Sequence, residues 1–138
     1  MQRNTAKTAI AIGIGCKKGC PSEAIVTLVV RAMAAASCTG SCASLFTHET
    51  KKSEPSLADA AKALGLPLIF LDGDVLRQAS SRAITSSPKV MELYGVPSIA
   101  ETAALAGAGP AAVLLLARMS DAGASCAIAG NEVRTSEP

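Results

Sequence analysis

Hydrophobic and polar positions alternate in blocks along the first forty residues, and each block has the period of a strand or a helix. The apolar run over residues 5–14 is short, rich in Ile and Ala and followed by a glycine-rich segment, so it predicts a buried strand. From Ser22, which can cap a helix, apolar residues recur at helical spacing as far as a break at 37–40. This part of the chain is therefore expected to fold as strand, loop and helix.

The middle of the chain repeats this alternation. Short apolar runs at 43–47 and 67–71 predict the second and third strands. Between them, a polar loop leads to a helix that Ser53 caps, that carries Pro55 in its first turn and that stops at Gly65. Strand, helix and strand are therefore expected in this order.

Shorter elements follow the third strand. One helix is expected to start at Asp72 or Asp74, and another at the Ser87–Pro88 pair. The Ser- and Thr-rich run 79–87 between them is the most loop-like interior segment. The expected structure is two short helices joined by a polar loop.

The last third of the chain predicts one helix and two strands. Ser98 caps a helix rich in Ala, and apolar runs at 112–117 and 125–129 predict strands joined across residues 120–123. So short a connection makes this pair antiparallel. Alternating strands and helices followed by a C-terminal antiparallel hairpin predict an α/β fold of three layers, α/β/α, with a mixed sheet of about five strands.

Composition indicates the number of domains and the cellular location to expect for this fold. With 138 residues, 49% of them hydrophobic, the chain suits a single domain over residues 1–138 with an ordered core over about 6–130. Glu101 and the turn at 107–110 interrupt the apolar segment 98–117, so no membrane span is expected. No export signal is visible and the cysteines number five, so we expect a soluble protein of the cytoplasm.

Charge and motifs exclude some partners. The net charge is +2 and no basic stripe with interleaved aromatic residues exists, so nucleic acid is not an expected partner. The glycine-rich segment 13–19 lacks both the ending of a P-loop and the spacing of a dinucleotide fingerprint, and no cofactor is expected. Its backbone N–H groups and two lysines could form an anion site, although a plain tight turn between strand and helix explains the pattern equally well.

Basic side chains follow each of the first three predicted strands. If these strands are parallel, their carboxyl ends meet at one edge of the sheet, where open α/β sheets bind ligands. The cations would then form a basic rim suited to a polycarboxylate, and the alternative is a set of separate, solvated loop charges. The residues concerned are Lys17, Lys18, His48, Lys51, Lys52, Arg77 and Arg82.

Two cysteine pairs share a spacing that superficially fits a metal site. Cys16 and Cys20 follow a strand, whereas Cys38 and Cys42 follow a helix and should lie at the opposite edge of the sheet. We therefore expect small buried thiols and no bound metal.

Acid–base chemistry has few candidates in this sequence. His48 is the single histidine; it is expected to be exposed in a polar loop, where it could act as an acid or a base or touch a bound cobalt. A hydrolase that uses water and a carboxylate such as Glu49, Glu54 or Glu101 is also compatible with the sequence. The catalytic candidates are Glu54, Glu101 and His48.

Three segments, taken together in their order and separation, carry a family resemblance. They are Gly-Ile-Gly-Cys-Lys-Lys-Gly at 13–19, the spacing Thr47…Lys51…Glu54-Pro55…Leu57, and Gly-Val-Pro-Ser-Ile-Ala-Glu at 95–101 running into Ala103-Ala104-Leu105. With them, residues 8–130 resemble the CobE/CbiG C-terminal family of cobalamin biosynthesis. The chain departs from the family pattern at Ser56, where Gly is usual, and at His48-Glu49, where a small residue and Asp are common.

The resemblance implies a role in making the corrin ring of vitamin B12. CbiG is a longer protein that opens the ring lactone of a cobalt-precorrin, whereas CobE is the free-standing domain of the aerobic route, which this chain resembles more in length. The implied ligand is a precorrin or corrinoid, an acidic tetrapyrrole fringed with carboxylates, and other corrin-pathway enzymes are implied partners. A binding or accessory role is the leading hypothesis. Hydrolysis of the ring lactone and phosphate or nucleotide binding are the alternatives.

The motif matches and the charge argument together give one set of ligand-binding candidates. Glu101 belongs to it with two interpretations: it can complete a capping box with Ser98, or its carboxylate can orient Lys51 or a water beside the ligand. The set is Gly13, Gly15, Cys16, Lys17, Lys18, Gly19, Thr47, Lys51, Lys52, Ser86, Ser87, Ser98 and Glu101.

Overall fold

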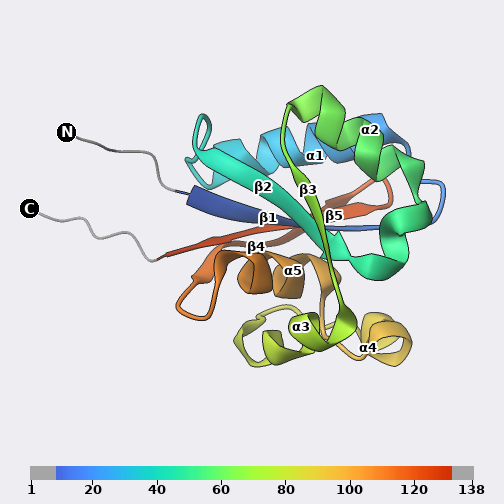
Figure 1. Cartoon of the computed structure of the whole chain (residues 1–138), viewed down its shortest axis with the longest axis vertical. Coiled ribbons are helices and arrows are strands. Elements are labelled where there is room, and N and C mark those ends of the chain that lie inside the picture. The colour runs from blue at the N-terminus through green and yellow to red at the C-terminus, as the bar shows by residue number, and fades with distance from the viewer. Residues whose placement is uncertain (1–8, 132–138) are drawn as a thin grey trace, which may run out of the picture.

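A computed structural model describes residues 9–131, and its strands form a five-stranded sheet with helices on both faces (Figure 1). The strand order is β3-β2-β1-β5-β4. Strands β1, β2 and β3 are parallel, β5 runs antiparallel to β1, and β4 runs antiparallel to β5. The strands are β1 (Ala9–Cys16), β2 (Cys42–His48), β3 (Leu68–Leu71), β4 (Val113–Asp121) and β5 (Ala124–Gly130).

The helices make the outer two layers. Helices α1 and α2 cover one face of the sheet, and α5, α3 and α4 lie on the other (Figure 1). The predicted three-layer α/β fold with a mixed sheet and a C-terminal hairpin is thus confirmed. The helices are α1 (Ser22–Ala35), α2 (Pro55–Leu64), α3 (Gly73–Gln78), α4 (Pro88–Tyr94) and α5 (Ile99–Ala108), with short 3₁₀ helices over Glu49–Ser53 and Ser80–Arg82.

The two faces of the sheet differ in the size of their side chains. Because residues alternate along a strand, Ile10, Ile12 and Ile14 of β1 all point to the side of α1 and α2, where the bulky core lies. Ala11 and Gly13 point the other way, toward α5, and the β5 residues Ala127 and Ala129 join that side. Helix α5 therefore packs on a surface of small residues and can approach the strands closely.

The closest approach is at Gly13. A Cβ atom added there would overlap the carbonyl oxygen of Ala100 and come within 2.6 Å of the Ala104 nitrogen, so helix backbone lies directly on strand backbone. Gly107, in the last turn of α5, is similarly tight, but a Cβ atom added there would meet the side-chain ring of Phe46, at 2.5 Å. Gly13 is therefore a packing position rather than part of a ligand-binding loop.

Several predicted boundaries are corrected by the structure. Gly13 and Gly15 lie inside β1, which continues to Cys16, because the small-residue face under α5 has to extend that far. Pro21 occupies the N-cap position of α1 in place of the predicted Ser22. Glu54 occupies that of α2 in place of Ser53, since a 3₁₀ helix fills the predicted polar loop. The start of the first predicted strand, residues 5–8, lies outside the described residues.

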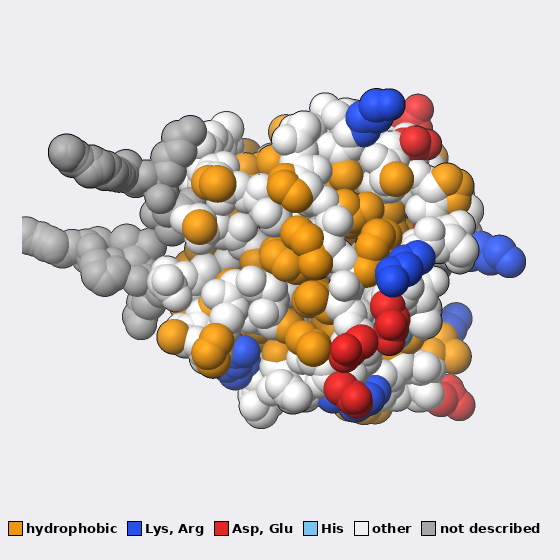
Figure 2. All heavy atoms as spheres, in the orientation of Figure 1, with side chains coloured by type: hydrophobic (Ala, Val, Ile, Leu, Met, Phe, Trp, Pro, Cys, Tyr) orange, Lys and Arg blue, Asp and Glu red, His pale blue; other side chains and the backbone are white. Residues whose placement is uncertain are grey.

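The charged surface is also unevenly distributed. Figure 2 shows one face of the molecule, and most of the charged side chains visible there lie on the half where β1, β2 and β3 end. Hydrophobic side chains occupy the middle of this face. None of the helices within residues 9–131 has the length and apolar character needed to cross a bilayer.

Replacing Gly13 by Ala tests the close approach of α5 to β1. Because backbone atoms of two elements would have to separate, we expect a loss of about 3 kcal/mol in the free energy of unfolding, at the upper end of overpacking costs. Gly107→Ala is the matched control: the Phe46 ring can move and a helical Ala gains about 1 kcal/mol over Gly, so its loss should be much smaller. Urea unfolding monitored by circular dichroism measures both. Equal losses would contradict this account of the packing.

Candidate functional site

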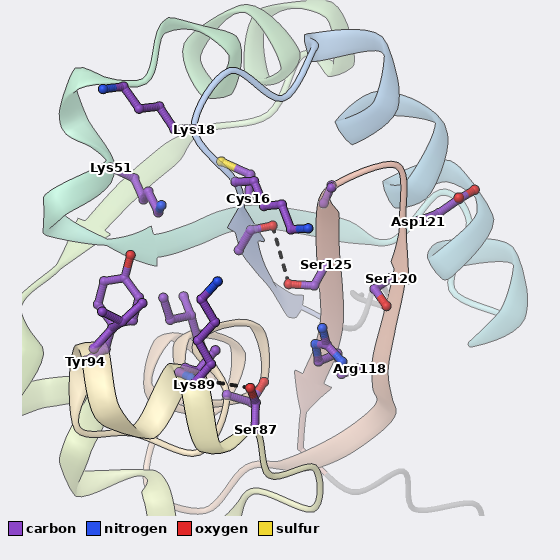
Figure 3. A pocket seen from close by; sticks show the side chains of 18 of the residues that line it. Cys16, Lys18, Lys51, Ser87, Lys89, Tyr94, Arg118, Ser120, Asp121 and Ser125 are labelled. Atoms are coloured by element: carbon purple, nitrogen blue, oxygen red, sulfur yellow. Dashed lines mark hydrogen bonds between the residues drawn. The ribbon is translucent and has the colours of Figure 1, made fainter.

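An open cavity of about 600 Å³ lies where β1 ends, between α4 and the β4–β5 hairpin (Figure 3). Because β5 is antiparallel to β1, the hairpin turn at Ala122–Gly123 comes to the same edge as the carboxyl end of β1. The N-terminal end of α5 forms part of the wall. The polar and charged lining residues are Cys16, Lys17, Lys18, Lys51, Ser87, Lys89, Tyr94, Ser98, Arg118, Ser120, Asp121 and Ser125.

The cavity is strongly basic. Its lining includes one carboxylate within residues 9–131, that of Asp121, and Arg31 pairs with it at 2.9 Å on the exposed outer side. In Figure 3 the side chain of Asp121 points away from the opening of the cavity, whereas Lys51, Lys89 and Arg118 lie around this opening. Five cations line the cavity, and in the part of the chain that the structure describes none of them forms an ion pair: Lys17, Lys18, Lys51, Lys89 and Arg118.

An apolar wall faces these cations. Val90, Leu93 and Tyr94 from α4 and Ile99 from α5 contribute to it, and Leu93 is 61% exposed. The Nζ atom of Lys51 lies 5.8 Å from the centre of the Tyr94 ring, close enough for a cation–π contact. The cavity thus offers positive charge beside an uncovered hydrophobic surface.

Backbone and side-chain hydrogen bonds hold the loops of the cavity in place. The N–H of Lys17 donates to the carbonyl of Gly123 at 2.8 Å, which joins the loop after β1 to the hairpin turn. The N–H of Gly19 donates to Glu54 Oε2 at 3.2 Å, so Glu54 anchors that loop and does not line the cavity. The hydroxyl of Ser125 donates to the carbonyl of Gly15 at 3.4 Å (Figure 3).

Two cavity-lining serines cap helices. Ser87 Oγ accepts the N–H of Val90 at 3.3 Å at the start of α4, and Ser98 Oγ accepts the N–H of Glu101 at 3.2 Å at the start of α5. Both caps were expected from the sequence. These bonds fix the first turns of both helices at the cavity.

Glu101 lies beneath the cavity and is completely buried. Its carboxylate accepts four hydrogen bonds, which come from the N–H groups of Ile84, Thr85 and Arg118 and from the Thr85 hydroxyl, at 2.7–2.9 Å. The carboxylate neither returns to the N–H of Ser98, as a capping box requires, nor bonds to Lys51, so these two expected contacts are corrected. Burial pushes the pKa of Glu101 upward, but the four donors outweigh burial and hold that pKa below its usual value.

The other ligand-binding candidates divide between the cavity and its surroundings. Thr47 is buried and donates to the carbonyl of Ile14 at 2.7 Å, which ties β2 to β1. Lys52 lies over the Phe70 ring at 6.0 Å, outside the cavity. The cavity brings together Gly15, Cys16, Lys17, Lys18, Lys51, Ser87 and Ser98, and it does not include Gly13, Gly19, Thr47, Lys52, Ser86 or Glu101.

The predicted basic rim is only partly formed. Arg82 donates to the carbonyls of Gly109 and Ala112 at 3.1 and 2.7 Å, so it lies at the far end of α5 and its expected place on the rim is wrong. Arg77 pairs with Asp74 beside a second hollow. Lys89 and Arg118 were not singled out by the sequence, because the predicted hairpin did not show which strand β5 would pair with.

His48 is buried, with 7% of its surface exposed, which corrects the expectation of an exposed loop histidine. It ends β2 and lines the second hollow, of about 470 Å³, while its ring centre lies 5.2 Å from that of Tyr94. Its Nδ1 atom accepts the N–H of Thr50 at 3.1 Å, so the proton of the neutral ring is on Nε2. Burial is the main cause that lowers the pKa of His48, and Lys51 and Arg77 act in the same direction.

The cysteines lie at opposite edges of the sheet, as expected. Cys16 ends β1 and Cys42 begins the parallel strand β2, so their pairs cannot share one metal ion. Within residues 9–131, no three potential metal-ligating side chains gather at one point. Burial raises the pKa of the Cys16 thiol to about 11, so the thiol that lines the cavity stays protonated at neutral pH.

The fold and the cavity together are typical of one class of protein. An α/β sheet with an open basic pocket at the carboxyl end of its parallel strands is a small-molecule-binding architecture. The family model described as cobalamin synthesis G C-terminus matches residues 10–129. The chain belongs to this family, which confirms the resemblance seen in the sequence, and it is a cobalamin-biosynthesis protein of the CobE/CbiG type.

Individual relatives agree with this assignment. The chain is 32% identical over 130 residues to Protein CobE of Sinorhizobium sp, a match that covers 94% of this chain and 84% of the relative. A crystal structure of CobE, a protein from the cobalamin biosynthetic pathway, superposes with a TM-score of 0.81 at 32% identity, covering 92% and 93% of the two chains. The structure of cobalamin biosynthesis protein chiG from Agrobacterium tumefaciens gives 0.71 at 31% identity, covering 90% and 99%.

The tautomer and pKa of His48 can be checked directly because the chain contains one histidine. We expect long-range ¹H–¹⁵N NMR spectra to show the Nε2–H form and a pKa below the ordinary 6.5. Since the folded pKa lies below the unfolded one, the stability that neutral His48 contributes is present above the unfolded pKa and is lost as the pH falls through the folded pKa. A protonated Nδ1 in the neutral ring, or a pKa above 6.5, would contradict the geometry described.

Proposed function

We propose that the cavity binds an acidic tetrapyrrole, a precorrin or corrinoid intermediate of the aerobic route, and that the protein holds this intermediate for other corrin-pathway enzymes. The observation that carries the proposal is the set of five cations, from four separate segments of the chain, that line one cavity and have no carboxylate partner among residues 9–131. Carboxylate arms around a macrocycle supply matching negative charges at several points. The exposed apolar wall beside them suits the ring itself.

The size of the cavity fits partial enclosure of such a ligand. Small-molecule sites generally measure about 300–1,000 Å³, and the volume here lies within that range. Because the cavity is open, one edge of the macrocycle would enter with its carboxylates against Lys51, Lys89 and Arg118 (Figure 3). The ring would lie on Val90 and Leu93. Each exposed charge contact contributes only about 0.2–1 kcal/mol, so binding depends on several contacts acting together.

Binding is favoured over hydrolysis of the ring lactone by the positions of the candidate acids and bases. Glu54 anchors the loop at Gly19, Glu101 is buried with four donors around its carboxylate, and His48 faces the second hollow. None of these three lines the cavity. A general base has to reach the proton that it abstracts, and these groups lie outside the space proposed for the ligand.

The double variant Lys51→Ala/Lys89→Ala tests the proposal. Removing two cavity cations should weaken binding by about 0.4–2 kcal/mol, or about 2- to 30-fold in Kd, and should flatten its salt dependence. The variant Lys52→Ala/Lys62→Ala is the matched control, because it removes the same charge from outside the cavity and should bind almost normally. Titration with a panel of precorrins and hydrogenobyrinic acid, followed by tetrapyrrole absorbance, measures both affinities.

Two outcomes would count against the proposal. Equal losses in the cavity variant and in the control would show that only overall charge matters. Conversion of the bound tetrapyrrole to a product of different mass by the unsubstituted protein would favour the hydrolase.

A further inference from the structure

We propose that Glu101 is a positioning residue for this cavity: its buried carboxylate holds two opposite walls so that Arg118 and Lys89 face the same ligand. The inference rests on the proposed function, because it explains how that binding site is held together. Glu101 itself is completely buried and does not line the cavity.

One wall is strand β4. The pairing of β4 with β5 shifts between Leu116 and Met119, which leaves two β4 residues opposite a single β5 residue, Ala127. Arg118 is one of these two residues, and its N–H donates to Glu101 Oε2 at 2.9 Å. A bulge of this kind redirects side chains. The hydrogen bond to Glu101 therefore fixes the bulge at the place where it aims Arg118 toward the cavity.

The other wall is the segment that leads into α4. Oε1 of Glu101 accepts the N–H groups of Ile84 and Thr85 at 2.8 and 2.7 Å, and Oε2 accepts the Thr85 hydroxyl. Two residues later Ser87 caps α4, whose first turn carries Lys89. By holding residues 84–85, the carboxylate of α5 sets where this helix begins.

The requirement is for a carboxylate rather than for any polar side chain. All four partners are donors, and the two oxygens of an ionised Glu only accept. A Gln amide would turn its NH₂ group toward at least one N–H donor, which leaves a buried donor without an acceptor. In a simple capping box Gln replaces Glu without loss, so Glu101→Gln separates the two situations.

The test compares Glu101→Gln with Thr102→Val. Thr102 is the next residue of α5, is equally buried, and donates from its hydroxyl to the carbonyl of Ser98, so its loss weakens the helix without releasing either wall. Both variants should fold. Both should also unfold at a lower urea concentration than the unsubstituted protein. We expect the Kd for hydrogenobyrinic acid to rise about fivefold in Glu101→Gln, as for the loss of one charge contact, and to stay within about 1.5-fold in Thr102→Val.

If Glu101 acts by positioning Lys89 and Arg118, the effect of Glu101→Gln on the Kd should depend on these two cations. General destabilisation would not depend on them. In a Lys89→Ala/Arg118→Gln background, which keeps the backbone N–H of residue 118, Glu101→Gln should change the Kd by less than about 1.5-fold. An undiminished effect in that background would overturn the positioning role, as would a normal Kd in folded Glu101→Gln. If Glu101→Gln does not fold, Thr85→Val removes one of the four hydrogen bonds and should raise the Kd in the same direction, and an unchanged Kd there overturns the role.

A ligand-free measurement keeps this inference separate from the proposed function. In ¹H–¹⁵N spectra, Glu101→Gln should shift the amides of both walls, residues 84–87, 89–90 and 117–119, whereas Thr102→Val should not. If the unsubstituted protein binds no tetrapyrrole, the proposed function fails and the role of Glu101 in ligand binding fails with it. If the protein binds but the shifts are confined to α5, only the positioning role is overturned.

Discussion

The close approach of α5 to β1 is the constraint on which the rest of the structure depends. Without a side chain at Gly13, helix backbone rests on strand backbone, and the small side chains of Ala11, Ala127 and Ala129 extend this flat contact across the sheet. The helix cannot slide or rise without creating a gap or a clash. Its first turn is consequently fixed beside the carboxyl end of β1, and the cavity forms at that place.

A buried negative charge then organises what surrounds the cavity. Burying an ionised carboxyl group is costly unless hydrogen bonds replace its hydration, and the four donors around Glu101 provide that replacement. Three of these donors are backbone N–H groups of segments without regular pairing. The Glu101 side chain therefore accepts the N–H groups of both a loop and an irregular strand. The cations remain on the surface of the cavity, where they can meet a ligand.

The sequence predicted the elements better than the site. Periodicity located the strands and helices because burial on one or both faces leaves a local pattern, and the short connection near Gly123 identified the hairpin. The burial of His48 depends on Tyr94, which is distant in the chain, and the aim of Arg118 depends on a bulge that leaves no local signal. Charge spacing could not show that Arg82 binds carbonyls at the far end of α5, because long-range packing decides that contact.

The position of Tyr94 has a practical consequence. The chain contains one tyrosine and no tryptophan, so its tyrosine emission arises at a single place, the wall shared by the cavity and the second hollow. A tetrapyrrole absorbs in the range where tyrosine emits, and a pigment resting against α4 would quench that light by energy transfer. The protein therefore carries its own optical probe of occupancy, without any label.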